Sequence, residues 1–148
     1  MKLVIQRVSR AEVRVESRVV GVIAEGFLVL VGFEKGDADA QIKKAARRVA
    51  SLRVFEDEQG RMNRGLDEVK GKVLAVSQFT LAGSIQKGRR PGFDRAMPGE
   101  DAEPLFERFV ELLRLQGVQV ETGIFGAQME VELVNSGPVT LLWDDAPT

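Results

Sequence analysis

The sequence predicts an α/β fold (α+β-like) of mixed or antiparallel sheets, with two helices packed on one face. Strand-like segments recur along the whole chain, some alternating and some continuously apolar. Only two segments repeat their apolar residues at helical spacing. The chain has 148 residues and no Pro-, Ser- or Gly-rich linker, which is typical of one domain with a sizeable core. Residues 1–148 are therefore interpreted as a single domain.

The first quarter of the chain is predicted to form strands. Residues 2–8 and 11–16 alternate apolar and polar side chains, and residues 19–24 follow as a third short strand. Residues 27–33, FLVLVGF, are almost continuously apolar, as expected of a central strand that is covered on both faces.

A helix is predicted to follow, with Asp37 as its N-cap. Its apolar face is predicted to consist of Ile42, Ala45, Ala46, Val49 and Leu52. The opposite, solvated face carries the basic residues Lys43, Lys44, Arg47 and Arg48. Residues 56–63 are interpreted as a turn-rich loop, and residues 73–79 as another strand.

The second half contains one more helix. Residues 82–99 are irregular and rich in Gly, Pro and basic residues. The helix is expected from about 101 to 116, with Pro104 tolerated in its first turn and Gly117 ending it. Three strands complete the chain, near 118–122, 127–134 and 139–143. The helices can cover one face of the sheet, so the other face needs a second sheet or another subunit.

The composition narrows the chemistry, because the chain has no Cys, no His and no Tyr. This excludes a Cys nucleophile, a Ser-His-Asp triad, a His general base and zinc sites built from His or Cys. The acidic residues are scattered and show no EF-hand spacing, so we predict no metal and no cofactor. Catalysis would depend on hydroxyls, carboxylates, Lys, backbone amides or the substrate itself.

Charge and hydropathy bear on partners and location. The formal net charge of −1 argues against nucleic-acid binding through overall charge, although a local basic patch is compatible with it. No apolar run approaches the ~18–20 residues of a membrane span. The N-terminus alternates like a strand and does not resemble a signal peptide. We therefore expect a cytoplasmic protein without a membrane partner.

Two sequence motifs have small polar residues where an apolar run ends: SQFTL (77–81) and NSGPVT (135–140). The first is either a strand end with a Ser/Thr-rich turn, or a site where hydroxyls and backbone N–H groups stabilise an oxygen that gains charge. Thr80 as a nucleophile would need a base, and none lies nearby in sequence. The second motif suits a turn between two strands, and its Gly-Pro step is one of the few where a cis bond is accessible.

The segment IQKGRRPGFDR (85–95) is either a solvated loop or a phosphate-contacting one. Lys87, Arg89 and Arg90 fall within four positions, and Gly88 and Gly92 allow close approach. The basic run KKAARR (43–48) is interpreted as the solvated face of a helix.

Six segments, in one order along nearly the whole chain, resemble D-aminoacyl-tRNA deacylases, the D-tyrosyl-tRNA(Tyr) deacylase family. SQFTL and NxGPVT are the motifs that define this family, and a related deacylase family specific for L-amino acids carries different strings at both places. The six segments are IQRV (5–8), LVGFEKGD (30–37), LRVFEDEQGRMN (52–63), VLAVSQFTLA (73–82), KGRRPGF (87–93) and ETGIFGAQMEVELVNSGPVT (121–140).

The resemblance implies an obligate homodimer, layered β/β/α, with its active sites at the subunit interface. The Gly137–Pro138 bond would be cis, and the pair would reach into the partner's pocket, held in place by Arg7. Its carbonyls would crowd the side on which an L-amino acid carries its side chain, so that D-residues and glycine would be accepted.

The resemblance also assigns site residues and partners. Catalytic residues lining the pocket would be Ser77, Gln78, Phe79 and Thr80. The wall around the terminal adenosine would include Ala102, Phe125 and Met129, and the tRNA backbone would meet Lys87, Arg89 and Arg90. Backbone donors near Phe79 and Thr80, together with the 2′-OH of the terminal ribose, would carry hydrolysis, which fits the absence of His. The partner would be the acceptor end of D-aminoacyl-tRNA, and no DNA partner is expected.

One position departs from the family pattern: Ser136 stands where the family often has an acidic residue. Ser can still hydrogen-bond the turn backbone, as Asp would. Two alternatives stay open, a non-catalytic tRNA-binding module and a Thr80-dependent hydrolase of small esters.

Overall fold

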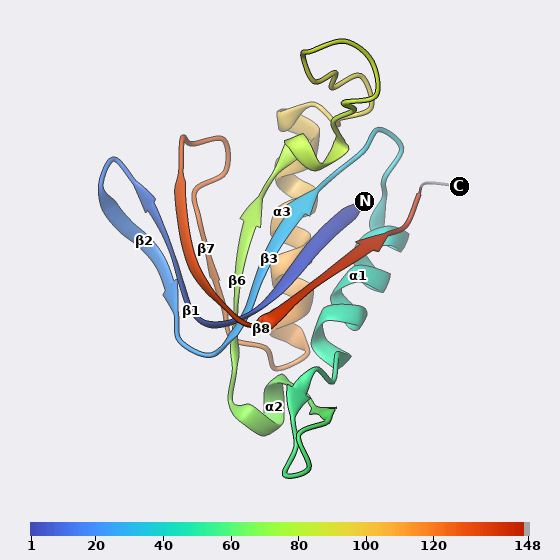
Figure 1. The fold of residues 1–148 in the computed structure, drawn as a ribbon. Coiled ribbons are helices and arrows are strands. Elements are labelled where there is room, and N and C mark those ends of the chain that lie inside the picture. Colours follow the sequence, from blue (N-terminus) through green and yellow to red (C-terminus); the bar gives the residue numbers. More distant parts are fainter. Residues whose placement is uncertain (147–148) are drawn as a thin grey trace.

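A curved six-stranded mixed sheet forms the body of the protein in the computed structural model, which describes residues 1–146 (Figure 1). The first strand pairs antiparallel with three others, β2, β3 and β8, whereas β6 runs parallel to both β3 and β7. The strands are β1 (Lys2–Val15), β2 (Arg18–Ile23), β3 (Gly26–Gly32), β6 (Lys72–Ser77), β7 (Val120–Thr122) and β8 (Glu130–Asp144). A mixed sheet with helices on one side confirms the predicted α/β class.

Two pairs of predicted strands are each one continuous strand. Residues 2–8 and 11–15 belong to β1, and the strands predicted near 127–134 and 139–143 merge into β8, which begins at Glu130. These two long strands pair along most of their lengths, from Lys2↔Asp144 to Arg14↔Glu130. On the outer surface Arg10 and Arg14 hydrogen-bond Glu132 at 2.6 and 3.0 Å, which holds the pKa of this carboxyl below its usual range. Such exposed pairs add little stability.

Two long helices, α1 (Asp39–Ser51) and α3 (Gly99–Leu115), lie side by side on one face of the sheet (Figure 1). The predicted faces of α1 are confirmed, since Ile42 and Val49 are fully buried and the basic residues are exposed. The main core lies between these helices and the sheet. A second buried cluster lies on the other face, where the curved sheet folds over itself: Val8, Ala11, Val13, Ile23, Leu28, Leu74 and Val76.

Several predicted boundaries were wrong. Asp37 is not the N-cap of α1: Ala38 takes that place, and the Asp37 carboxylate instead accepts hydrogen bonds from the Met1 ammonium and from the Glu34 N–H, each at 2.7 Å. Pro104 lies in the second turn of α3, because this helix begins at Gly99. The segment expected to be a loop, 56–63, contributes to a small hairpin followed by a short helix: β4 (Phe55–Glu56), β5 (Met62–Arg64) and α2 (Leu66–Val69).

None of the helices within residues 1–146 is long and apolar enough to cross a membrane.

Candidate active site

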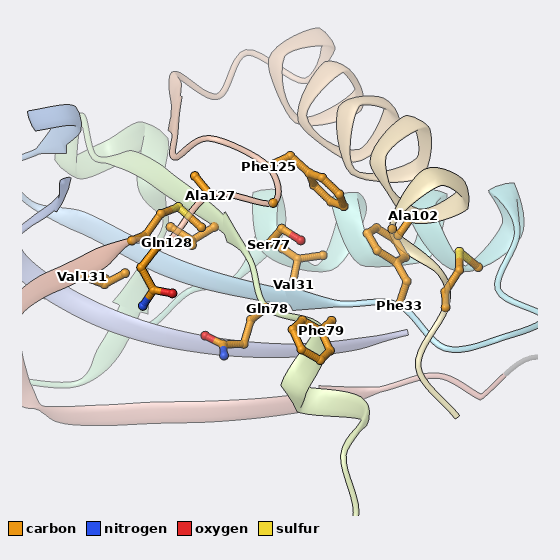
Figure 2. A pocket seen from close by; sticks show the side chains of 15 residues that line it. Val31, Phe33, Ser77, Gln78, Phe79, Ala102, Phe125, Ala127, Gln128 and Val131 are labelled. Carbon is orange, nitrogen blue, oxygen red and sulfur yellow. The ribbon is translucent and has the colours of Figure 1, made fainter. Parts of the chain in front are cut away.

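A pocket of about 490 Å³ opens where the parallel strands β3 and β6 end, beside the first turn of α3 (Figure 2). Ligands commonly bind at the carboxyl ends of parallel strands, and this volume is typical of small-molecule sites. The segment after β7 closes the pocket with Phe125 and Met129. Of the residues predicted from the sequence, six line this one cavity: Ser77, Gln78, Phe79, Ala102, Phe125 and Met129.

No charged side chain of residues 1–146 lines the pocket. Its polar side chains are Ser77, Gln78 and Gln128, and the rest of the lining is apolar or glycine. In Figure 2 the amides of Gln78 and Gln128 lie toward Val131, whereas Phe33 and Phe125 lie beside Ala102. Among residues 1–146, the pocket therefore has no titratable side chain for general acid or base catalysis, and its polar chemistry comes from amides, one hydroxyl and the backbone.

The SQFTL segment leaves two backbone donors without an acceptor among residues 1–146, on Phe79, which lines the pocket, and on Thr80, which follows it. Strand β6 ends at Ser77, and the Gln78 N–H makes the last ladder bond to the Val31 carbonyl at 2.7 Å. The chain then turns into the 3₁₀ helix η1 (Phe79–Ala82), whose first N–H groups have no intrahelical acceptor. Within the described part of the chain, the N–H groups of Phe79 and Thr80 donate to no acceptor. They can therefore donate to a ligand oxygen.

Gly32 explains how this turn packs so closely on the sheet. A Cβ atom at this position would lie 2.8 Å from Leu81 Cβ and 2.9 Å from the carbonyl oxygen of Gln78. Such distances are shorter than van der Waals contact allows, so any side chain here would push the turn away. The sequence analysis missed Gly32, although a glycine that ends an apolar strand signals close backbone approach.

Thr80 lies beside the pocket and is not among the residues that line it. It is exposed, and its Oγ1 accepts a hydrogen bond from Nε2 of Gln78. An amide cannot act as a base toward a hydroxyl, so the hydrogen bond that residues 1–146 offer to Thr80 Oγ1 does not activate it as a nucleophile.

The wall residues come from two elements. Ala102 lies in the first turns of α3 and is 6% exposed, and its short side chain leaves room in the cavity. Phe125 packs at a tilt against Phe106 of α3, with ring centroids 6.1 Å apart. Gly126, with φ +77°, lets the chain reverse directly after it. The apolar wall is thus anchored to the main core.

Gly137 and Pro138 lie in a bulge of β8, away from the pocket of their own chain. Gln6 pairs with Thr140 and Val8 with Asn135, so residues 136–139 stand opposite Arg7 alone. The Gly137–Pro138 peptide bond is cis, Gly137 has φ +141°, and both residues are exposed. Neither residue lines the pocket described above. The two motifs that the sequence analysis identified therefore lie apart within one chain.

Arg7 fixes this bulge from beneath. It is 7% exposed, and its Nε donates to the carbonyl of Ser136 at 2.8 Å while Nη1 donates to the carbonyl of Val54 at 2.6 Å. Its Nη2 lies 3.9 Å from a carboxylate oxygen of Glu56. The arginine thus ties the bulge to the start of the β4–β5 hairpin.

Asn135 closes the base of the bulge, and the sequence analysis missed it. Its Oδ1 accepts the N–H of Val139 at 2.7 Å, and its Nδ2 donates to Thr140 Oγ1 at 2.9 Å. The sequence did contain a signal for this role, an Asn at the start of the NSGPVT motif, because Asn side chains often hydrogen-bond nearby backbone groups in turns.

The predicted basic residues, Lys87, Arg89 and Arg90, are exposed in a loop that projects beyond η1 (Figure 1). They are not part of the pocket lining. Among the described residues, no group of three acidic side chains is placed to hold a metal ion.

Comparisons with known proteins agree over the whole chain. The family described as "D-Tyr-tRNA(Tyr) deacylase" matches residues 4–144. A "D-aminoacyl-tRNA deacylase" of Symbiobacterium thermophilum is 57% identical over 148 residues, covering 100% of this chain and 98% of that protein. A protein of the same name from Thermotoga petrophila is 51% identical over 146 residues, covering 99% and 98%.

Two solved structures share the fold. "c-Myc DNA Unwinding Element Binding Protein" aligns with a TM-score of 0.91 and 38% identity, covering 99% of both chains. A structure described as a probable eukaryotic D-amino acid tRNA deacylase aligns with a TM-score of 0.83 and 19% identity, covering 97% and 98%.

Proposed function

Because the chain belongs to the D-Tyr-tRNA(Tyr) deacylase family, we propose that it hydrolyses the ester bond of D-aminoacyl-tRNA, releasing the free D-amino acid and tRNA. The observation that carries this proposal is the pocket itself. It has no charged lining, and the two N–H groups beside it have no other acceptor in the described chain. Such a site suits an ester that needs positioning and stabilisation of its carbonyl oxygen, and does not suit side-chain acid–base chemistry.

Hydrolysis proceeds through the main chain in this proposal. The N–H groups of Phe79 and Thr80 donate to the ester carbonyl oxygen as it gains charge, while Ser77 and Gln78 line the cavity. The 2′-OH of the terminal ribose assists, so the substrate supplies the group that the chain lacks. A single oxyanion donor can be worth about 10²–10³ in rate, which is a large share of what an activated ester requires.

Chirality is selected by the Gly137–Pro138 pair of a second subunit. The pair is exposed and lies outside its own chain's pocket, so one protomer holds a pocket without this filter. In a two-fold symmetric homodimer each subunit offers its pair to the other pocket. The carbonyls then occupy the side on which an L-amino acid carries its side chain, and D-residues and glycine avoid the clash.

The remaining predicted residues bind the tRNA end. Ala102, Phe125 and Met129 surround the terminal adenosine, and Lys87, Arg89 and Arg90 contact phosphates of the acceptor strand. Proofreading of aminoacyl-tRNA places the reaction in the cytoplasm. The absence of a metal, of another cofactor and of a DNA partner remains predicted.

Thr80→Ala is expected to retain activity within about tenfold of the unsubstituted protein, because it removes only the neutral hydrogen bond to Gln78. The backbone N–H of residue 80 is still present. Removal of a true nucleophile costs about 10⁶-fold in kcat. Single-turnover deacylation of D-Tyr-tRNA measures the difference, and a loss near the larger figure in a folded variant would support the Thr80-dependent hydrolase.

The proposal is tested by comparing release of tyrosine from D-Tyr-tRNA and L-Tyr-tRNA by the purified protein. We expect the D-ester to be cleaved at least about a hundredfold faster, equal to ~2.7 kcal/mol of discrimination. Binding of both substrates without cleavage would favour the non-catalytic module. Raising the salt concentration separates the small-ester hydrolase, because only a substrate held through phosphates loses affinity steeply with salt.

A further inference from the structure

Two aromatic side chains at the edge of the pocket, Phe79 and Phe93, are exposed to solvent. Phe79 is 57% exposed and Phe93 is 36% exposed. Their ring centroids are 5.1 Å apart with the planes at 62°, an edge-to-face pair. Phe79 also lines the pocket (Figure 2), so Phe93 packs against a residue of the cavity wall. The face of an exposed aromatic ring is an unused binding surface.

Contacts within the fold fix the position of this aromatic pair. A Cβ atom at Gly83 would lie 2.9 Å from Cε1 of Phe93, so the glycine makes the space in which this ring rests. Ser84 and Gly92 exchange two backbone hydrogen bonds of 2.8 Å directly beside it.

The return of the loop to the body is fixed as well. Arg95 forms an ion pair of 2.6 Å with Glu34, whose side chain is 3% exposed. The Lys35 N–H donates to the Arg95 carbonyl at 2.9 Å, which ties this segment to the end of β3. The position of Phe93 relative to the pocket is therefore set by contacts on both sides of it.

Three basic residues lie in the same loop as Phe93. Lys87, Arg89 and Arg90 occupy the exposed part of the loop beyond the Ser84–Gly92 pair. Neither Lys87 nor the two arginines forms an ion pair within residues 1–146. Aromatic faces for bases, followed by cations for phosphates, are the combination with which proteins hold single-stranded nucleic acid.

We propose that Phe79 and Phe93 form a stacking subsite for the cytidines that precede the terminal adenosine of tRNA, with Lys87, Arg89 and Arg90 meeting their phosphates. This inference rests on the proposed function and extends the site beyond the adenosine pocket. The single-stranded end enters past the loop, stacks a cytidine base against the exposed face of Phe93, and delivers the adenosine and its ester to the cavity. Base–aromatic stacking is tolerant of sequence and sensitive to loss of the ring.

The test compares two substrates that differ only in the nucleotides concerned, D-Tyr-tRNA and D-tyrosyl-adenosine. Phe93→Leu is expected to lower kcat/KM for D-Tyr-tRNA about tenfold, through KM, because an aliphatic side chain keeps the packing and loses the stacking face. It should leave hydrolysis of D-tyrosyl-adenosine unchanged. Phe93→Trp should retain activity on both. Leu115→Ala, which removes an exposed side chain at the far end of α3, is the matched control.

Each outcome of these measurements supports or overturns the stacking subsite. An equal loss on both substrates would place Phe93 in the adenosine pocket or in the folding of the loop, and no loss on either would remove the subsite. Loss with Trp as large as with Leu would exclude stacking. Fluorescence-measured binding of the oligoribonucleotide ACCA gives a readout without hydrolysis: Phe93→Leu should weaken it about tenfold, and unchanged binding overturns the inference. Hydrolysis of D-tyrosyl-adenosine by the unsubstituted protein tests the proposed function separately.

Discussion

Arg7→Met is expected to reduce the preference for D-Tyr-tRNA over L-Tyr-tRNA by at least about tenfold, or ~1.4 kcal/mol. The guanidinium of Arg7 is the group that holds the carbonyl of Ser136, directly before Gly137, and it links this bulge to the carbonyl of Val54. Methionine fills a similar volume and donates no hydrogen bond, so the bulge keeps its sequence and loses its position. The L-ester should then be cleaved faster, while the D-ester is cleaved at nearly the original rate.

The same substitution should cost stability. A hydrogen bond from a charged donor contributes about 1.5–3 kcal/mol, and two carbonyls lose such a donor. Thermal denaturation measures this loss independently of selectivity. Arg53→Met is the matched control, because Arg53 also donates to a backbone carbonyl of the hairpin, that of Asn63 at 2.7 Å, and its side-chain hydrogen bonds within residues 1–146 go to Asn63. An unchanged D/L ratio in Arg7→Met would contradict the role of Arg7 in chiral selection.

Gly32→Ala is expected to lower kcat/KM for D-Tyr-tRNA by about 10²-fold, because displacing catalytic groups by about 1 Å can cost that much. The new methyl group would be 2.9 Å from the Gln78 carbonyl and 2.8 Å from Leu81 Cβ. The carbonyl belongs to the backbone and cannot rotate away, so the turn that carries the Phe79 and Thr80 N–H groups must shift. Chiral preference should be unaffected, since the substitution leaves intact the hydrogen bonds by which Arg7 and Asn135 hold the Gly137–Pro138 bulge.

General destabilisation has to be separated from displacement of the turn. Gly60→Ala serves this purpose, because Gly60 has φ +76° and its Cβ would meet nothing within 4 Å. Alanine there strains the backbone by about 1 kcal/mol in the β4–β5 hairpin, away from the pocket. Gly60→Ala should therefore lose stability and keep activity. If Gly32→Ala retains full activity, the SQFTL turn does not position the donors.

Much of this fold follows from periodicity. The continuous apolar run of β3 and the helical spacing in α1 and α3 report burial directly, and the structure confirms them. The continuity of β1 and β8 is not evident from either strand alone, because the polar residues Ser9 and Arg10 and the Gly-Pro step interrupt each pattern locally. Pairing between the two strands overrides those interruptions. Asp37 failed as a predicted N-cap because a partner 36 residues away in sequence, the Met1 ammonium, binds its carboxylate.

For the site, the sequence identified the residue types that could carry chemistry, and the structure shows which of them meet. Ser77, Gln78 and Phe79 come together with Ala102, Phe125 and Met129 because β6, α3 and the segment after β7 converge at one end of the sheet. The atoms that Gly32 allows to approach, Leu81 Cβ and the Gln78 carbonyl, could not be recognised from its own segment, because they lie far from it in sequence. The role of Asn135 is local, since its side chain bonds Val139 and Thr140 within the same motif; it was missed because this motif was interpreted as a turn between two strands.

The most direct test of the central proposal, that one D-selective site is built from two chains, uses mixed dimers of Arg7→Met and Gly32→Ala subunits carrying different affinity tags. In such a dimer the intact pocket belongs to the Arg7→Met subunit, and the intact Gly137–Pro138 bulge belongs to its partner. If the bulge acts across the interface, the purified mixed dimer cleaves D-Tyr-tRNA and rejects L-Tyr-tRNA, although Arg7→Met homodimers cleave both. A mixed dimer that cleaves the L-ester as readily as Arg7→Met homodimers would show that each chain selects for itself, and would contradict the proposal.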